Sequence, residues 1–231
     1  MRQIQIFDDH ATFISPAIHT DQHKHHALEL IVSVHGIIHI KDNFGNAFAS
    51  QTVLVLPDQP HQTTTTGEAA FIFIEPESKL ANTILTILKP TQSVQSIEGR
   101  MSAADRKVFA LGSIPESLSK TNNAVNQVDS RIESATAFIR SQITTHEFSL
   151  ETLADIACLS TSRFTHLFKD QIGIPVRPFI RWCRMRVAVT SVLSGMTLTQ
   201  AAHEAGFSDT AHLSRTFVEM FGVNPSSVLK Q

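Results

Sequence analysis

The chain has 231 residues, of which 42% are hydrophobic and 17% charged, and its mean hydropathy is close to zero. This composition excludes disordered, collagen-like and small disulfide-rich proteins, and the length fits two modest domains that each bury a core. No apolar run reaches the roughly 20 residues needed to cross a bilayer, and the first residues lack the apolar stretch of a signal peptide. We therefore expect a cytoplasmic protein that has no membrane partner.

Charge is unevenly distributed, although the formal net charge is only −2. Residues 1–125 carry nine basic and twelve acidic side chains, whereas residues 126–231 carry ten and nine. Any attraction to nucleic acid must therefore depend on where the arginines lie rather than on their number. The two cysteines, Cys158 and Cys183, occur in apolar helical patterns, form no CxxC pair and are expected to be buried structural thiols.

Residues 1–78 predict a β-domain. Short runs rich in β-branched residues occur between residues 28 and 74, with turn sequences such as DNFGN between them. These runs are LELIVSV, IIHI, TVLVLP and AAFIFIE. Several short antiparallel strands favour a barrel or jelly roll.

Helical periodicity begins at residue 79 and defines a segment over 79–118. Leu80, Ile84 and Leu88 form an apolar stripe, which predicts either a homodimer contact or packing against the barrel. Residues 119–128 are polar and rich in Ser, Thr and Asn, so we expect a linker there. Residues 129–231 predict helices throughout. The fold class is therefore a two-domain α+β protein, a β-barrel followed by an all-α domain.

The all-α part contains an internal duplication. The segment SLETLADIACLSTSRFTHLFKDQIGIPV aligns with TLTQAAHEAGFSDTAHLSRTFVEMFGVNP at an offset of 48 residues, which becomes 49 after one insertion in the second copy. Each copy predicts a short helix with small alanines, a turn of three or four residues and a second capped helix, which is the helix-turn-helix layout. Gly206 provides the turn residue in the second copy, where the first has Cys158 and Leu159. A plain helical bundle is the alternative, but two such units joined by a long helix from about Val176 to Leu193 favour a DNA-binding domain.

The motif residues of the two copies are Leu153, Ala154, Ser160, Phe164, Phe168, Lys169, Gly173, Arg184, Met185, Ala201, AGFSD at 205–209, LSRTF at 213–217, Gly222 and Pro225. This pattern resembles the AraC/XylS transcription regulators over about residues 130–229. The resemblance implies two rigidly linked helix-turn-helix units whose recognition helices enter successive major grooves of a double-stranded DNA operator.

The resemblance also implies which side chains face DNA. Those of the first recognition helix are Ser162, Arg163, Thr165 and His166, and those of the second are Ala211, His212 and Arg215. Arginine pairs bidentately with guanine, His, Ser and Thr bond to base edges, and Ala contacts the thymine methyl group. For Ser162 and Thr165, an exposed helix face without base contact is an equal alternative.

Phosphate contacts are expected from an arginine stripe and from two helix N-termini. Arg177, Arg181 and Arg184 follow one another at i, i+4 and i+7 on one face of the long helix. Ser160 and Ser208 stand where the two recognition helices are expected to begin.

The β-domain carries a second resemblance. His23, His25 and Glu29, followed by Gly36 and later by PDQPH ending at His61, are similar to the two motifs of the cupin barrel. On one continuous strand the first three side chains would point to the same side, with His61 coming from a neighbouring strand. Three imidazoles and a carboxylate suit a divalent ion such as Zn, Ni, Fe or Mn.

Two alternatives remain open for these histidines. His39 shares the parity of His25 and could take the place of His61. The barrel could also bind an organic effector without any metal, and the histidines would then be solvated or satisfied by hydrogen bonds.

The sequence thus predicts a sequence-specific DNA-binding transcription regulator, not an enzyme, whose cupin domain senses a metal ion or small molecule and which acts as a homodimer. One alternative is a cupin metalloenzyme of dioxygenase or isomerase type with a helical accessory domain. Another is a non-specific nucleic-acid binder, against which the near-neutral C-terminal half argues.

Overall fold

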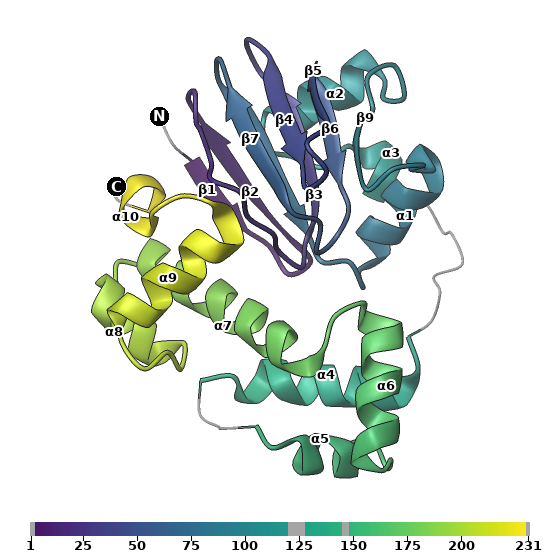
Figure 1. The fold of residues 1–231 in the computed structure, drawn as a ribbon, viewed down its shortest axis with the longest axis vertical. Coiled ribbons are helices and arrows are strands. Elements are labelled where there is room, and N and C mark those ends of the chain that lie inside the picture. Colours follow the sequence, from purple (N-terminus) through teal and green to yellow (C-terminus); the bar gives the residue numbers. More distant parts are fainter. Residues whose placement is uncertain (1–2, 120–127, 145–147, 230–231) are drawn as a thin grey trace. The chain divides into compact units, whose positions relative to one another are not determined.

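The computed structural model describes residues 3–119, 128–144 and 148–229 (Figure 1). The chain divides into two compact units, one of Met1–Val125 with Val218–Val228 and the other of Asn126–Phe217 with Leu229–Gln231. The predicted linker lies outside the described residues except at its two ends. Within the described residues, no helix has both the length and the apolar character needed to cross a membrane.

The N-terminal unit contains two antiparallel sheets, which confirms the predicted β-domain. The larger sheet has the strand order β1-β2-β8-β3-β6-β9, and the smaller has the order β5-β4-β7. The strands are β1 (Gln3–Ile6), β2 (His10–Ser15), β3 (Leu28–Ser33), β4 (Ile38–Asp42), β5 (Ala47–Ser50), β6 (Thr52–Val55), β7 (His61–Thr65), β8 (Ala69–Ile74) and β9 (Val94–Ser96).

Strand β3 lies at the centre of the larger sheet, between β8 and β6, with Leu30 opposite both Ile72 and Leu54. Its two faces belong to different cores. Leu28 and Leu30 pack with the helices α1 (Lys79–Leu88) and α2 (Ala103–Ala110), while Ile31 packs between the sheets. A strand covered on both faces needs a continuous apolar run instead of alternation. This explains the LELIVSV sequence and places Glu29, on the face of Ile31, inside the barrel.

The segment predicted to be helical over 79–118 contains α1 (Lys79–Leu88), α2 (Ala103–Ala110) and α3 (Glu116–Ser119), with strand β9 between the first two. The apolar stripe of α1 is buried in the core that it shares with β3 and β8. Of the two alternatives for this stripe, packing against the barrel is therefore the one observed. Figure 1 shows the three helices beside the same sheet.

The second unit is helical, as predicted. Its helices are α4 (Ser130–Gln142), α5 (Leu150–Ile156), α6 (Thr161–Ile172), α7 (Val176–Leu193), α8 (Leu198–Glu204) and most of α9 (Thr210–Phe221); α10 (Pro225–Val228) belongs to the first unit. The rings of Phe164, Phe168 and Phe179 are fully buried, and their centroids lie 5.6 Å and 5.4 Å apart in edge-on contacts. This aromatic cluster joins α6 to α7.

Replacing Phe168 with Ala should lower the free energy of unfolding by about 3–5 kcal/mol, because the substitution leaves a cavity in this aromatic cluster. Urea unfolding followed by the fluorescence of Trp182, the single tryptophan, measures the loss in the helical unit. The exposed neighbour provides the control, since Lys169→Ala should change the same free energy by less than about 0.5 kcal/mol. A loss below about 1 kcal/mol for the Phe168 variant would contradict the packing described.

Candidate functional site

Three histidines converge at one end of the barrel. His23 and His61 form an isolated antiparallel bridge, with each backbone N–H donating to the other residue's carbonyl oxygen at 2.9 Å. His61 begins β7, as expected of a residue from a separate strand. The prediction of one continuous strand through His23, His25 and Glu29 is wrong, because β3 begins only at Leu28. The bridge to His61, rather than strand alternation, brings His23 into the cluster.

One ring nitrogen of each of His23, His25 and His61 lies within 4.8 Å of the other two, and the three residues are at most 6% exposed. Their Nδ1 atoms face the backbone carbonyl oxygens of Asp21, Ala27 and Gln59 at 2.8, 3.1 and 2.9 Å. A carbonyl oxygen only accepts, so each Nδ1 carries the hydrogen and the Nε2 lone pair of each neutral ring points into the cluster. Fixing the tautomer in this way is what metal-ligating histidines require.

Glu29 completes the cluster. Its Oε2 lies 3.0 Å from His61 Nε2 and 3.4 Å from His25 Nε2, and the side chain is 2% exposed. With the hydrogen of the neutral His61 ring on Nδ1, Glu29 Oε2 and His61 Nε2 present lone pairs to each other, and neither makes a hydrogen bond within the described part of the chain. A second proton on His61, which would donate to the carboxylate, or a cation between the two atoms satisfies both.

The protonation equilibria of the cluster follow from its burial. Desolvation, together with the nearby His61 and His25, lowers the pKa of His23 to about 3. Burial by itself would raise the pKa of Glu29, but contacts with His25 and His61 outweigh it and hold the pKa well below its usual range. Burial opposes protonation of His61, and the Glu29 carboxylate outweighs that effect and raises its pKa. His23 is therefore neutral and Glu29 ionised near pH 7.

The donor set fits a divalent transition metal, since three imidazole nitrogens and one carboxylate oxygen are the ligands that Zn, Ni, Fe and Mn accept. Glu29 approaches two of the three histidines, so it is either a fourth ligand or the hydrogen-bonding partner of the others. The suggested substitute, His39, does not fit, because it is exposed on β4 and lines a shallow pocket on the smaller sheet. That alternative is wrong.

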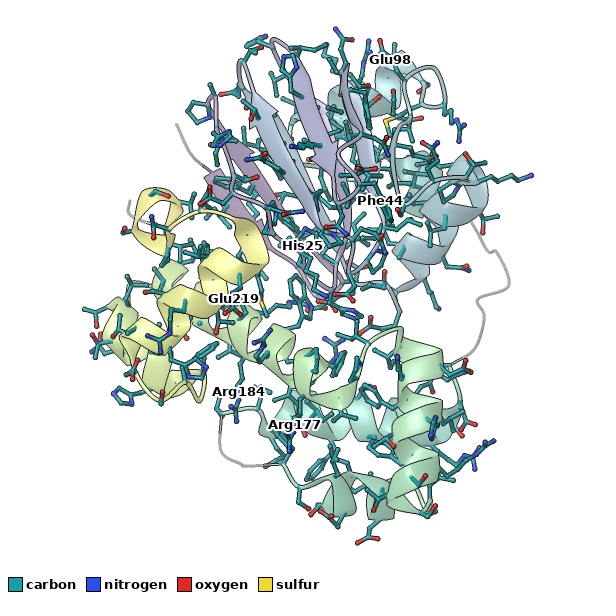
Figure 2. All side chains as sticks on the ribbon, viewed as in Figure 1. His25, Phe44, Glu98, Arg177, Arg184 and Glu219 are labelled. Carbon is teal, nitrogen blue, oxygen red and sulfur yellow. The ribbon has the colours of Figure 1, made fainter. Side chains whose placement is uncertain are left out.

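The surroundings of the cluster include residues that the sequence analysis missed. Asp21, whose carbonyl oxygen orients His23, donates its N–H to the carbonyl oxygen of Gly222 at 2.8 Å. A Cβ atom at Gly222 would lie 2.7 Å from His23 Nδ1, so only glycine fits there. The ring of Phe221 lies 6.3 Å from that of His25, which Figure 2 labels. The sequence indicates Gly222 only as a motif residue of the second repeat.

A second group, also missed, consists of His26, Glu75 and Glu77, which offer ligand atoms within 4.8 Å of one another. His26 Nε2 lies 3.2 Å from Glu77 Oε2. No sequence motif connects these residues, since the pairing of β3 with β8 brings them together.

The duplicated segment forms two helix-turn-helix units, made of α5 and α6 and of α8 and α9. The turn residues Cys158 and Gly206, 48 positions apart, both adopt left-handed backbone conformations, with φ of 52° and 74°. Cys158 is exposed, so the prediction that it is buried is wrong, whereas Cys183 is buried as expected. Cys158 ends α5 in a left-handed conformation and its side chain is exposed, which the apolar pattern around it did not indicate.

The predicted base-facing side chains lie on the first two turns of α6 and α9. Ser162, Arg163, His166, Ala211 and Arg215 are exposed. Thr165 and His212 are partly buried, and the Thr165 hydroxyl donates to the Ser162 carbonyl oxygen at 3.0 Å. The structure thus places the set on the helix ends that recognition helices present to DNA.

The three arginines of the predicted phosphate-binding stripe differ in their exposure to solvent. Arg177 and Arg181 are exposed on α7, while Arg184 is partly buried, and its guanidinium group lies against the turn at Gly206. Figure 2 labels Arg177 and Arg184. A Cβ atom on Gly206 would approach Arg184 Nε to 3.1 Å. Arg184 therefore supports the turn of the second unit in this structure.

The two recognition helices begin differently. The Ser160 hydroxyl caps α6 by accepting from the N–H of Arg163. In α9, Asp209 takes this role, and its Oδ1 accepts from the N–H of His212 at 2.6 Å. The expectation that Ser208 begins the second helix is wrong, because the residue inserted in the second copy shifts the cap by one position.

Two helix-turn-helix units joined by one long helix define a DNA-binding domain, and comparison with known proteins agrees. Residues 153–231 match a family model described as a helix-turn-helix domain. The arabinose operon regulatory protein of Escherichia coli is 28% identical over 138 residues, which cover 56% of this chain and 45% of that protein. Its counterpart from Salmonella typhimurium is also 28% identical, with 47% of its length covered. The chain thus spans about half the length of these relatives.

The whole fold is also found in a solved structure. ToxT from Vibrio cholerae superimposes with a TM-score of 0.63, covering 96% of this chain and 98% of that one at 14% identity. These comparisons confirm the resemblance to the AraC/XylS transcription regulators. Residues 153–231 thus form a helix-turn-helix domain, and the fold of the chain is similar to that of ToxT.

The paired turns allow a matched test. Gly206→Ala should lower the free energy of unfolding by more than about 1 kcal/mol, because alanine resists a left-handed backbone and its Cβ would press on Arg184. Cys158→Gly should leave stability unchanged or raise it, because glycine adopts the same conformation without strain. Urea unfolding of both variants measures the two effects. A neutral Gly206→Ala, or a clear loss for Cys158→Gly, would contradict the assignment of equivalent turns.

Proposed function

We propose that this protein is a sequence-specific DNA-binding transcription regulator whose barrel senses a divalent metal ion or a small molecule. The observation that carries the proposal is the pair of helix-turn-helix units on one rigid helix, each with the first turns of its second helix exposed. The match to the arabinose operon regulatory proteins supports the same function. The regulator works in the cytoplasm, where its operator DNA is accessible, and it is not an enzyme.

DNA recognition is divided between base and backbone contacts. Arg163 and His166 from α6, and Ala211 and Arg215 from α9, reach base edges in successive major grooves. Arg177 and Arg181 on α7 hold the phosphate backbone and so set the register on the duplex. The near-neutral charge of this half favours specific over non-specific binding, since non-specific affinity comes almost wholly from phosphate neutralisation.

The barrel is proposed to hold the metal through His23, His25 and His61, with Glu29 as fourth ligand or as their partner. When bound, the metal supplies the positive charge that Glu29 and the three imidazoles lack. In this chain the backbone carbonyl oxygens of Asp21, Ala27 and Gln59 keep the rings in the ligating tautomer. The metal would thereby tie the segment before β3 to the start of β7.

Two alternatives concern the barrel alone. ToxT has been solved with an unsaturated fatty acid bound, so an organic effector is the second candidate ligand. The histidine cluster is also compatible with a metalloenzyme, and only that alternative predicts turnover, because a sensor returns its ligand unchanged.

A homodimer is proposed as the active form. The stripe Leu80, Ile84 and Leu88 is not its interface, since the barrel core buries it. Light scattering on the purified protein, with and without operator DNA, gives the stoichiometry. A monomer under both conditions would remove the dimer from the proposal.

Arg215→Ala should weaken binding to the selected operator by about 1–3 kcal/mol, because it removes a direct base contact. Fluorescence anisotropy with a labelled duplex measures the dissociation constant. Arg131→Ala is the matched control, since it removes the same charge from an exposed arginine that is paired with Asp129. Equal losses for the two variants would show that only overall charge matters, and an unchanged affinity for the Arg215 variant would remove it from the interface.

Untagged protein should contain near-stoichiometric metal by plasma mass spectrometry. The double variant His23→Ala, His25→Ala should lose that metal, because two of its three nitrogen ligands are gone. His39→Ala, which alters an exposed histidine of the same domain, should retain it. If wild-type protein carries no metal and binds none on titration, the barrel is a site for an organic effector.

A further inference from the structure

Strand β1 forms an open edge of the larger sheet, since among the described strands it pairs with β2 alone. Just beyond the strand, the N–H of Phe7 donates to the carbonyl oxygen of His10 at 2.8 Å, so these two residues are a hydrogen-bonded pair. Hydrogen-bonded and non-hydrogen-bonded pairs alternate along antiparallel strands, so Gln5 bonds to β2 while Ile4 and Ile6 do not. The backbone N–H and C=O groups of both isoleucines therefore point away from the sheet.

Within the described residues, no strand, loop or side chain bonds to these outward groups of Ile4 and Ile6. An open edge is a template for pairing with another chain, and proteins usually protect it with a charged residue or a proline. The sequence of β1, QIQI, contains neither. The opposite edge of the same sheet is protected, because Glu98 follows β9 and its carboxylate accepts from the Ser50 hydroxyl and the Gln51 N–H at 3.2 and 3.4 Å. Figure 2 labels Glu98.

The side chains of β1 suit a second copy of the same strand. Ile4 lies opposite Phe13 of β2, which packs on the core between the two sheets, and strand alternation places Ile6 on the same face. Both isoleucines are partly buried, whereas Gln5 points to the other face and is exposed. An antiparallel second copy would cover these isoleucines with its own and continue the core across the boundary.

We propose that β1 is the homodimer interface, where β1 of a second copy pairs with it in antiparallel orientation across a two-fold axis at Gln5. In this register Ile4 of each copy lies opposite Ile6 of the other, so every outward N–H and C=O group of these residues gains a partner. Each Gln5 lies directly opposite its counterpart, with Cβ atoms about 5 Å apart, and one amide can donate to the other. The surface is therefore self-complementary, as a two-fold interface requires.

This inference rests on the homodimer of the proposed function and names its surface. The pairing is short, because β1 has four residues. Small interfaces are typical of weak complexes, so the dimer should dissociate on dilution.

Gln5→Lys and Gln5→Glu test the axis in the full chain, because each places two like charges directly opposite each other. Sedimentation equilibrium should show that the dissociation constant of the dimer rises roughly fivefold or more for either variant alone. An equimolar mixture of the two should recover wild-type association, because lysine then faces glutamate. Gln92→Lys and Gln92→Glu alter an exposed glutamine outside β1 and should associate as wild type does.

A disulfide tests the register directly. Residues in a non-hydrogen-bonded pair have Cα atoms about 4.5 Å apart, which is within the range that a disulfide spans. Gln5→Cys, in a chain whose exposed Cys158 is replaced by serine, should therefore form a covalent dimer on mild oxidation, seen on a non-reducing gel. Gln92→Cys in the same background should stay unlinked.

The outcomes separate this inference from the function on which it rests. If wild-type protein is monomeric at every concentration, the proposed homodimer fails and the inference with it, while DNA binding is tested separately. If wild-type protein dimerises and both charged variants associate equally well, the inference alone is overturned. The same holds if the mixture associates no better than either variant alone, or if Gln5→Cys forms no covalent dimer.

Discussion

The Glu29 carboxylate is enclosed within the barrel, 3.0 Å from His61 Nε2, on a strand whose two faces are both covered. An ionised carboxylate in an apolar interior costs several kcal/mol unless positive charge or hydrogen-bond donors compensate it. Strand β3 cannot expose Glu29 to water without opening the core beneath α1 or the core between the sheets. The groups that compensate the buried charge must therefore lie next to the carboxylate inside the barrel. His25 and His61 are the neighbouring groups in this position.

This constraint explains several features that are otherwise unrelated. The isolated bridge between His23 and His61 closes the open end of the barrel next to Glu29. The backbone carbonyl oxygens of Asp21, Ala27 and Gln59 hold the rings with Nε2 inward. Gly222 lies against the first of these carbonyl groups at a position where no side chain fits. Each of these features holds imidazole nitrogens around a buried negative charge, which connects the structure of the barrel to its proposed role as a sensor.

The sequence predicted the element types well wherever packing is local. Continuous apolar runs indicated the buried strands, and the duplicated pattern indicated both helix-turn-helix units and the helix that joins them. The sequence-based predictions were wrong where contacts between residues far apart in the chain determine the structure. Strand alternation could not show that β3 starts at Leu28, so the prediction of one strand through His23 was wrong. The stripe on α1 was equally consistent with a partner chain until the structure placed it on β3 and β8. One inserted residue moved the N-cap of α9 from Ser208 to Asp209. The apolar periodicity of a helix does not indicate which residue caps it.

The sequence by itself thus determined the class of the protein, because the repeat, the apolar patterns and the turn residues are local features that can be identified without a structure. It also named His23, His25, Glu29 and His61 as a group. Only the tertiary structure decided that Glu29 faces His61 and His25 at close range, that Arg184 lies against the Gly206 turn, and that Asp209 accepts from the N–H of His212. The physical reason is the same in each case. Hydrogen-bond direction and burial depend on which atoms the fold brings within about 3 Å, and residue spacing along the chain does not specify them.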